Sequence, residues 1–344
     1  MKRKWIRRVS WILLTPVLLF VILMILLYIP PVQNLLRREV TAYASKATGM
    51  QIQVERIDLR FPLNLLVRGV EVIQQPDTLL SLESLNVRVQ AWPLVKGKVE
   101  VDEVTLSQVA FNSANLIEGM KIKGVLGRFF LQSHGVDLSN ELAVINQTEL
   151  SDTHVQMLMN DTTTTPKDTT ASAPVNWKVD LHKLKLKNVS FSMQLPADSM
   201  RMAAHIGEAF INDAQADLKN QFYELKQFLL SGSSANYDTG AAKPGEGFDA
   251  SHIAVRDIRI GLDSLLYKGR DMNAVIREFS MNERSGLSIT SLTGRAFSND
   301  SIIRIPGIKL QTPHSEIDLS AQTYWELVNI HYRTFVRRSQ CLYR

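Results

Sequence analysis

Alternation of apolar and polar residues is the dominant pattern of the chain after residue 50. Six segments alternate in this way, which is typical of strands that have one face in contact with apolar surroundings. They are 51–59, 79–89, 99–111, 179–191, 253–260 and 303–310. The pattern therefore predicts a mostly β region that occupies nearly all of the chain beyond residue 50.

A finer rhythm lies inside the six segments, because their apolar residues follow one another at steps of two, three and two. A step of two keeps side chains on one face of a strand, whereas a step of three moves them to the other face unless a bulge or tight bend absorbs one residue. We therefore expect repeated strands with one apolar face and a bulge within each, at spacings too irregular for a strict-period solenoid. The candidate lining residues of an apolar groove, each equally compatible with ordinary core packing, are Ile52, Val54, Val99, Val101, Val179, Leu181, Ile253 and Val255.

An uncharged run of 19 residues, Trp11–Ile29, precedes the β region. At about 1.5 Å per residue this run is long enough to cross the hydrocarbon core of a bilayer as a helix. Its length exceeds the roughly 7–15 apolar residues of a signal peptide, and no small-residue cleavage site follows, so we favour an uncleaved anchor over a cleaved signal. The membrane residues in this interpretation include Trp11, Leu14, Phe20 and Ile29.

Charge flanking the run sets the expected orientation. Five basic residues lie within 1–8, while Arg37 and Arg38 follow the run. The positive-inside rule then places the first residues in the cytoplasm and the bulk of the chain across the membrane. We expect residues 1–31 to form the basic start and the single transmembrane helix.

Helical spacing marks the segment 32–49, whose residues Val32, Leu35, Leu36, Val40 and Tyr43 share one side. Pro31 suits the first turn of a helix, and Gly49 suits its end. The segment therefore predicts a short amphipathic helix that connects the anchor to the β region.

Polar stretches divide the remainder into expected units. Residues 160–175 are Thr-rich and contain two prolines, which predicts a linker or long loop between a first β segment, 50–159, and a second, 176–321. Residues 231–251 have a similar composition and predict a second loop, whereas 203–230 fits either a helix or a strand pair, of which we favour the strands. The tail, 322–344, loses the rhythm and is either an amphipathic helix or an out-of-frame end.

Composition and motifs argue against several classes of function. The net charge of +5 gathers at the two ends of the chain, so the nearly neutral middle disfavours a nucleic-acid-binding protein. The single cysteine, Cys341, excludes an intramolecular disulfide and a Cys-rich zinc site. No hydrolase, metalloprotease or nucleotide-binding motif is present, and the seven histidines are isolated from one another.

The adjacent carboxylates Asp102 and Glu103 are the nearest approach to an acid/base pair. Neighbouring side chains on a strand point to opposite faces, so the two would not cooperate in catalysis and more readily mark a turn or bulge. We expect no cofactor, no metal and no enzymatic activity.

Three stretches of this sequence resemble a known family. They are IQVERIDLRFPLNLLVRGVEV at 52–72, WPLVKGKVEVDEVTLSQVAF at 92–111, and the segment 287–321. Together with the basic start, the anchor and the short helix ending at Gly49, they resemble the AsmA-like superfamily, and within it the TamB-type translocation and assembly proteins of the Gram-negative envelope. The chain departs from full TamB proteins in length and in the absence of their C-terminal domain.

This resemblance implies a long, twisted antiparallel sheet curled into a groove with an apolar concave face and a polar convex face. It implies an inner-membrane protein whose bulk lies in the periplasm and whose groove carries phospholipid acyl chains to the outer membrane or assists protein assembly there with a barrel partner. A structural adaptor that docks on an outer-membrane barrel by strand addition is the alternative. An enzyme is the least favoured interpretation.

Overall fold

The computed structural model describes residues 28–61, 63–90, 92–93, 100–137, 140–159, 176–240 and 243–324. The anchor residues Trp11, Leu14 and Phe20, the linker 160–175 and the tail beyond residue 324 lie outside these ranges, so the predictions made for them stay predictions. Over the described ranges, no helix has both the length and the apolar character needed to cross a membrane.

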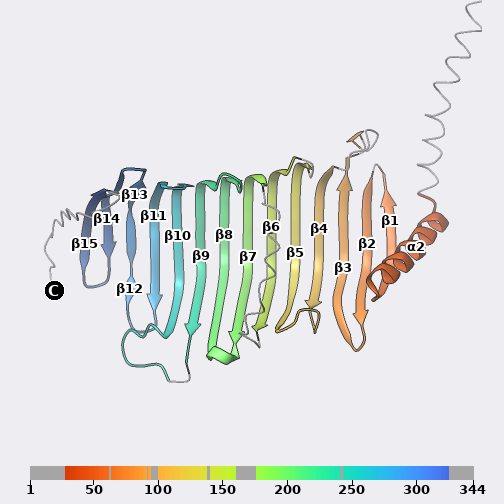
Figure 1. Cartoon of the computed structure of the whole chain (residues 1–344), viewed down its shortest axis with the longest axis horizontal. Helices are drawn as coiled ribbons and strands as arrows, with labels where there is room; N and C mark the ends of the chain where they lie inside the picture. The colour runs from red at the N-terminus through yellow and green to blue at the C-terminus, as the bar shows by residue number, and fades with distance from the viewer. Residues whose placement is uncertain are drawn as a thin grey trace, which may run out of the picture.

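One long helix precedes the sheet. Helix α2 (Pro30–Thr48) has proline in its first turn, and Gly49 ends it in the left-handed conformation at φ 69°. The N–H of Gly49 donates a hydrogen bond to the Ser45 carbonyl, 3.0 Å away, which satisfies one of the helix's terminal acceptors. These features confirm the predicted connecting helix and both of its end signals. The helix lies alongside the first strand of the sheet (Figure 1).

All strands belong to one sheet, which is curled but not closed (Figure 1). Its strands follow the chain in order, β1 to β11 and then β13, β14 and β15, while β12 pairs with β11 off this path. Six of them, β5 to β10, have 17 or 18 residues each, about three times the usual length of about 5–6 residues. The bounds are β1 (Gln51–Arg60), β2 (Asn64–Gln74), β3 (Asp77–Val89), β4 (Val101–Asn112), β5 (Met120–Asp137), β6 (Leu142–Met159), β7 (Lys178–Leu195), β8 (Met200–Asp217), β9 (Phe222–Asp238), β10 (His252–Lys268), β11 (Asp271–Glu283), β12 (Ser288–Ile289), β13 (Ser291–Ser298), β14 (Ile302–Gln311) and β15 (Glu316–Tyr324), with the short helix η1 (Pro196–Asp198) between β7 and β8.

The mostly β prediction is confirmed, since five of the six alternating segments lie wholly in strands and the sixth, 99–111, lies in β4 from Val101 onward. The strand interpretation of 203–230 is also confirmed, because this stretch is divided between β8 and β9. The loop predicted at 231–251 is wrong in its first part, because β9 continues to Asp238 and pairs there with β8 and β10. Small polar residues such as Ser231 and Ser234 are typical of loops, but here they belong to β9, which lies between the neighbouring strands β8 and β10.

The prediction of an antiparallel sheet is wrong at one place. Strands β6 and β7 are parallel, with Leu142 opposite Lys178 at one end and Leu158 opposite Gln194 at the other. A parallel pair needs a long crossover connection, and the 18 residues between these strands supply the necessary length. The two β segments expected on either side of residues 160–175 therefore join in one continuous sheet.

A line of irregular positions crosses the sheet from β1 to β9, and we call it the seam. At each seam position the Cα partner register skips one residue in both strands of a pair, or two at β8/β9. Several seam residues adopt left-handed backbone conformations, among them Gln108 at φ 49° and Asn188 at φ 53°. The seam residues are Glu55, Gly69, Glu83, Gln108, Gly127, Asp152, Asn188, Gly207 and Gly232.

The seam confirms that the sheet absorbs one residue within a step of three, although it does so in both strands of a pair rather than as a bulge in one. Leu106 and Val109 lie on either side of Gln108, and Leu186 and Val189 lie on either side of Asn188. Because each seam residue is absorbed by the irregularity, the apolar side chains before and after it stay on one face. A second irregularity falls at Asp102, between the pairs Arg88–Glu103 and Val89–Val101, which confirms the bulge expected there.

Candidate functional site: the apolar face of the sheet

One face of the sheet carries an unbroken row of apolar side chains, which we call the apolar row. Each member is the Cα partner of the next, so the row runs across eleven consecutive strands, β1 to β11. Cα partners lie directly opposite one another, and their side chains share a face. The members are Ile57, Val67, Leu85, Leu106, Phe129, Leu150, Leu186, Ala209, Leu230, Ile260 and Phe279.

The opposite face carries an equally continuous polar row, displaced from the apolar row by one residue in every strand. Adjacent residues of a strand point to opposite faces, so this displacement separates the two rows completely. The polar row runs through Arg56, Arg68, Ser84, Ser107, Arg128, Ser151, Lys187, Glu208 and Ser231. The two rows therefore lie on opposite faces of the sheet from β1 to β9, although the face of the polar row also carries single apolar residues such as Phe130 and Phe210.

Burial shows how little covers the apolar face. Of the apolar row only Ala209 is buried, and the other ten members are half-buried. Among the described residues just three leucines and alanines besides Ala209 are buried, namely Leu79, Leu82 and Ala143, together with Pro93, and no large side chain is less than 2% exposed. Neighbours within the sheet thus shield these side chains in part, and no second layer of described residues completes a closed core.

The sequence-predicted lining residues have the placement expected of a shared apolar face, apart from Val99, which lies outside the described residues. Each of the other seven is half-buried and faces an apolar Cα partner. The pairs are Ile52 with Val72, Val54 with Val70, Val101 with Val89, Val179 with Ala216, Leu181 with Ala214, Ile253 with Tyr237 and Val255 with Ala235. What this face binds is a separate question.

Sequence reasoning missed the members of the row in β2, β5, β6, β8, β9 and β11. In β8 the residues Ile206, Ala209, Ile211 and Ala214 keep the rhythm at steps of three, two and three. Alanines occupy two of these four positions, so the segment falls below the threshold of an obvious apolar pattern. Counting alanine, glycine and serine as compatible with the apolar face would have revealed the rhythm within this strand.

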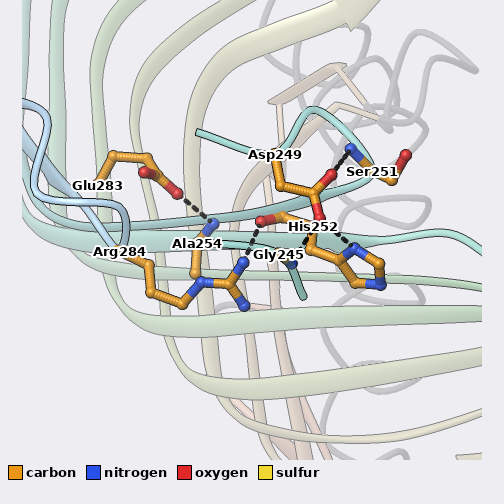
Figure 2. A network of polar contacts seen from close by, with 7 residues as sticks. All are labelled: Gly245, Asp249, Ser251, His252, Ala254, Glu283 and Arg284. Atoms are coloured by element: carbon orange, nitrogen blue, oxygen red, sulfur yellow. Dashed lines mark hydrogen bonds and ion pairs between the residues drawn. The ribbon is translucent and has the colours of Figure 1, made fainter. Parts of the chain in front are cut away.

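Polar chemistry concentrates at the connection between β9 and β10, where Asp249 holds its own loop together (Figure 2). Its carboxylate accepts hydrogen bonds from the backbone N–H groups of Gly245 and Ser251, at 3.2 and 2.9 Å, and contacts His252 Nδ1 at 2.9 Å. These contacts, led by the one from Gly245, lower the pKa of Asp249 to about 2. The arrangement fixes the shape of the loop.

A second carboxylate ties the same region to β11 (Figure 2). Glu283, 6% exposed, accepts hydrogen bonds from the backbone N–H groups of Ala254 and Ser285, at 3.3 and 2.6 Å. Hydrogen bonds from Ser285 are the main cause that lowers the pKa of Glu283. Arg284 donates from Nη2 to the His252 carbonyl, 2.9 Å away. Asp249, Glu283 and Arg284 therefore all bind neighbouring backbone or loop atoms.

Two small pockets lie beside irregular positions outside the seam, one at Asp102 and one at His182. A pocket of about 250 Å³ is lined by polar residues that include Arg88, Asp102 and His134, and one of about 70 Å³ lies beside His182 and Asp213. The contact with His182 and then the charge of Lys226 lower the pKa of Asp213. Within the described ranges no three His, Cys, Asp or Glu residues gather closely enough to hold a metal ion.

Comparison with known proteins returned no match, either to a protein-family model or to a curated protein. The features of the molecule itself must therefore carry the functional argument. They define a single-layer, open β-sheet protein with a continuous apolar row on one face and a polar row on the other.

Proposed function

We propose that this is a periplasmic protein of the Gram-negative envelope, anchored in the inner membrane, whose apolar face carries phospholipid acyl chains toward the outer membrane without catalysing a reaction. The apolar row is the observation that carries the proposal, because it is continuous over eleven strands and covered by no second layer of described residues. The uncharged run before α2 supports the anchor, and the resemblance to TamB-type proteins supports the envelope location.

The physical basis is the hydrophobic effect alone. Each CH₂ group moved from water onto an apolar surface gains about 0.8 kcal/mol when fully buried, so an acyl chain of many carbons binds well without any specific contact. Ten intervals between neighbouring strands, at about 4.8 Å each, make the row about 48 Å long. A row of this length accommodates an extended acyl chain at successive positions, which is what movement along the sheet requires. In this proposal the apolar face lies on the inside of the curl.

The test uses two adjacent residues that lie on opposite faces. A photoreactive amino acid replaces Leu186 of the apolar row or Lys187 of the polar row in the full chain, expressed in cells grown with ³²P-phosphate. Irradiation should attach labelled phospholipid to the protein at position 186 and not at position 187. Both positions lie in β7, far along the sheet from α2, so contact with the surrounding bilayer does not explain a difference between them.

Equal labelling at both positions, or none at position 186, would refute lipid carriage by this face. As a second step, Leu230→Asp places one charge in the same row in the next strand but one. It should lower the lipid adduct at position 186 while the protein remains in the membrane fraction.

A second candidate function, an adaptor that binds an outer-membrane barrel by strand addition, is supported by the unequal edges of the sheet. The edge at β1 is covered by side chains of α2, whereas β15 pairs with β14 alone among the described strands. Its residues Ile317 and Leu319 are 46% and 37% exposed. A photoreactive residue at Leu319 should crosslink to an outer-membrane barrel protein, and one at Gln53 in the covered strand should not; equal crosslinking would exclude edge-specific docking.

A further inference from the structure

Helix α2 meets the sheet through polar side chains that bind the exposed backbone of β1. Gln33 Nε2 donates to the Leu59 carbonyl at 3.1 Å, and Arg37 Nη1 donates to the carbonyls of Val54 and Glu55 at 3.2 and 3.0 Å. Near the end of the helix, the Ser45 hydroxyl accepts from the Ile52 N–H at 3.1 Å. These residues are four and eight positions apart, so they form one stripe along the helix.

A second stripe lies on the opposite side of α2, and we call it the outer stripe. It comprises Leu35, Glu39 and Tyr43, which are also spaced by four. A displacement of two residues turns an α-helix by about 200°, so the outer stripe points away from β1. Leu35 is 57% exposed and Tyr43 is 77% exposed, and the described part of the sheet leaves both uncovered.

The turn between β1 and β2 adds a third exposed apolar group, at the corner of the molecule where α2 begins. Phe61, at the tip of this turn, is 85% exposed. The contact from Gln33 to Leu59 places the start of α2 beside the end of β1, next to this turn (Figure 1). The corner is also where the uncharged run Trp11–Ile29 reaches the helix.

We propose that the outer stripe of α2 and Phe61, which together extend from this corner along the helix, lie in the headgroup region of the bilayer. A helix whose apolar side chains face away from the protein suits the interfacial plane of a membrane, and aromatic residues favour that depth. The chain itself brings the corner there, because the proposed anchor ends at the first turn of α2. The inference rests on the proposed inner-membrane anchor.

The consequence concerns orientation. An anchor alone leaves the sheet free to swing about its tether, whereas an interfacial α2 holds the edge strand β1 against the bilayer. The apolar row begins in β1 at Ile57 and would then start at the membrane surface. Lipid would enter the row from this end.

The experiment places a fluorescent label at single cysteines in the full chain, with Cys341→Ser as the background, reconstituted into vesicles of phosphatidylethanolamine and phosphatidylglycerol. Labels replace Phe20 in the anchor, Tyr43 in the outer stripe, Phe61 at the corner, and Asp198 in η1 as the remote control. Lipids that carry a nitroxide in the acyl chain or on the headgroup then quench labels at the matching depth. We expect the acyl-chain nitroxide to quench position 20, the headgroup nitroxide to remove most of the emission at positions 43 and 61, and neither to affect position 198.

The outcomes separate the corner from the anchor. Quenching at position 20 without quenching at 43 and 61 overturns the interfacial corner and leaves the anchor standing, whereas no quenching at any position overturns both. Protected emission at position 43 without nitroxide quenching would mean that another protein surface covers the outer stripe, which also overturns the proposal. In a last arm, Leu35→Glu should lower the quenching at position 61 and leave position 20 unchanged, and an unchanged position 61 would count against a shared interface.

Discussion

The closest backbone approach in the seam is at Gly207, where β8 passes β9. A Cβ atom at this position would lie 2.5 Å from the Gly232 carbonyl oxygen and 2.9 Å from the Ser231 carbonyl oxygen. Both obstacles are backbone atoms held by the sheet, so neither turns aside as a flexible side chain would. Gly207→Ala must therefore push the two strands apart or break their local pairing.

The size of the effect follows from two opposed terms. Overpacking of a well-ordered site typically costs about 1–3 kcal/mol. A Gly→Ala change at an unstrained position, in contrast, stabilises by about 0.4–1 kcal/mol because it restricts the unfolded chain. Gly307 in β14 supplies the second case, because a Cβ there would meet no atom within 4 Å. Gly207→Ala should therefore lower the free energy of unfolding by about 1–3 kcal/mol, while Gly307→Ala should leave it unchanged or slightly higher.

Urea unfolding followed by the β signal in circular dichroism measures the difference, with the full chain held in lipid nanodiscs. Hydrogen exchange on the same samples locates it, because the loss of protection in Gly207→Ala should concentrate in β8 and β9. An unfolding midpoint for Gly207→Ala equal to that of the wild type would refute the close approach. Equal losses in both variants would show that glycine is needed in these strands for a reason other than contact with β9.

Three further predictions concern the loop, the crossover and the helix. Asp249→Asn should lower the free energy of unfolding at neutral pH, and the difference from the wild type should shrink as the pH falls from the ordinary carboxyl pKa of 3.8 toward about 2, because a carboxyl whose pKa is lowered in the folded state contributes stability above this range and loses it on acidification. Thermal unfolding across this range, with Asp198→Asn as the control, measures the difference, and a difference that widens on acidification would contradict the prediction. Deletion of ten residues from 160–175 should destroy the β6/β7 pairing, because the connection must return over about 56 Å along the strand and would retain a reach of only about 31 Å. Protease resistance of β7 to β11 reports the pairing; a Gly/Ser segment of the same length in place of 160–175 should preserve this resistance, and its loss would mean that the sequence of the connection matters and not only its length. Ser45→Ala removes a hydrogen bond at the β1 edge and should cost about 0.5–1.5 kcal/mol of stability, seen as faster hydrogen exchange at Ile52, while Lys46→Ala on the exposed side should show no such change.

Whether a strand and its apolar positions can be predicted from this sequence depends on the size of the side chains at those positions. In β7 the apolar positions are filled by Leu181, Leu184, Leu186 and Val189, so both the strand and its bulges were apparent. In β8 and β9 the equivalent positions include alanine and serine, which fit the strand pairing but do not produce a recognisable apolar pattern in the sequence. A single-layer sheet accepts such residues because its apolar side chains need not fill a closed core.

The parallel pair could not be predicted, because alternation carries no strand direction. An apolar–polar pattern reads the same in a parallel and an antiparallel neighbour, and a polar stretch of 16 residues fits either a long hairpin loop or a crossover. The anchor and tail predictions stay untested by the described residues. For the candidate site, the sequence indicated the apolar-face residues of β1, β3, β4, β7 and β10, but not those of the other strands or that all of them form one row from β1 to β11.

Registration across β6 and β7 decides whether the sheet has one apolar face or two. A tight hairpin sets the register of strands that it joins, but a crossover leaves this to contacts within the pair, where a slip of one residue would turn the apolar residues of the second half to the polar side. Two contacts oppose such a slip: Leu150 faces Leu186 in the apolar row, and Asn188 Nδ2 donates to Asp152 Oδ1 at 2.7 Å in the seam. Asp152 and Asn188 both adopt the left-handed conformation, so the irregular position of β6 lies opposite that of β7 at a single register. The seam thus keeps the apolar side chains on one face within each strand and, between β6 and β7, aligns the two halves of the sheet as one surface.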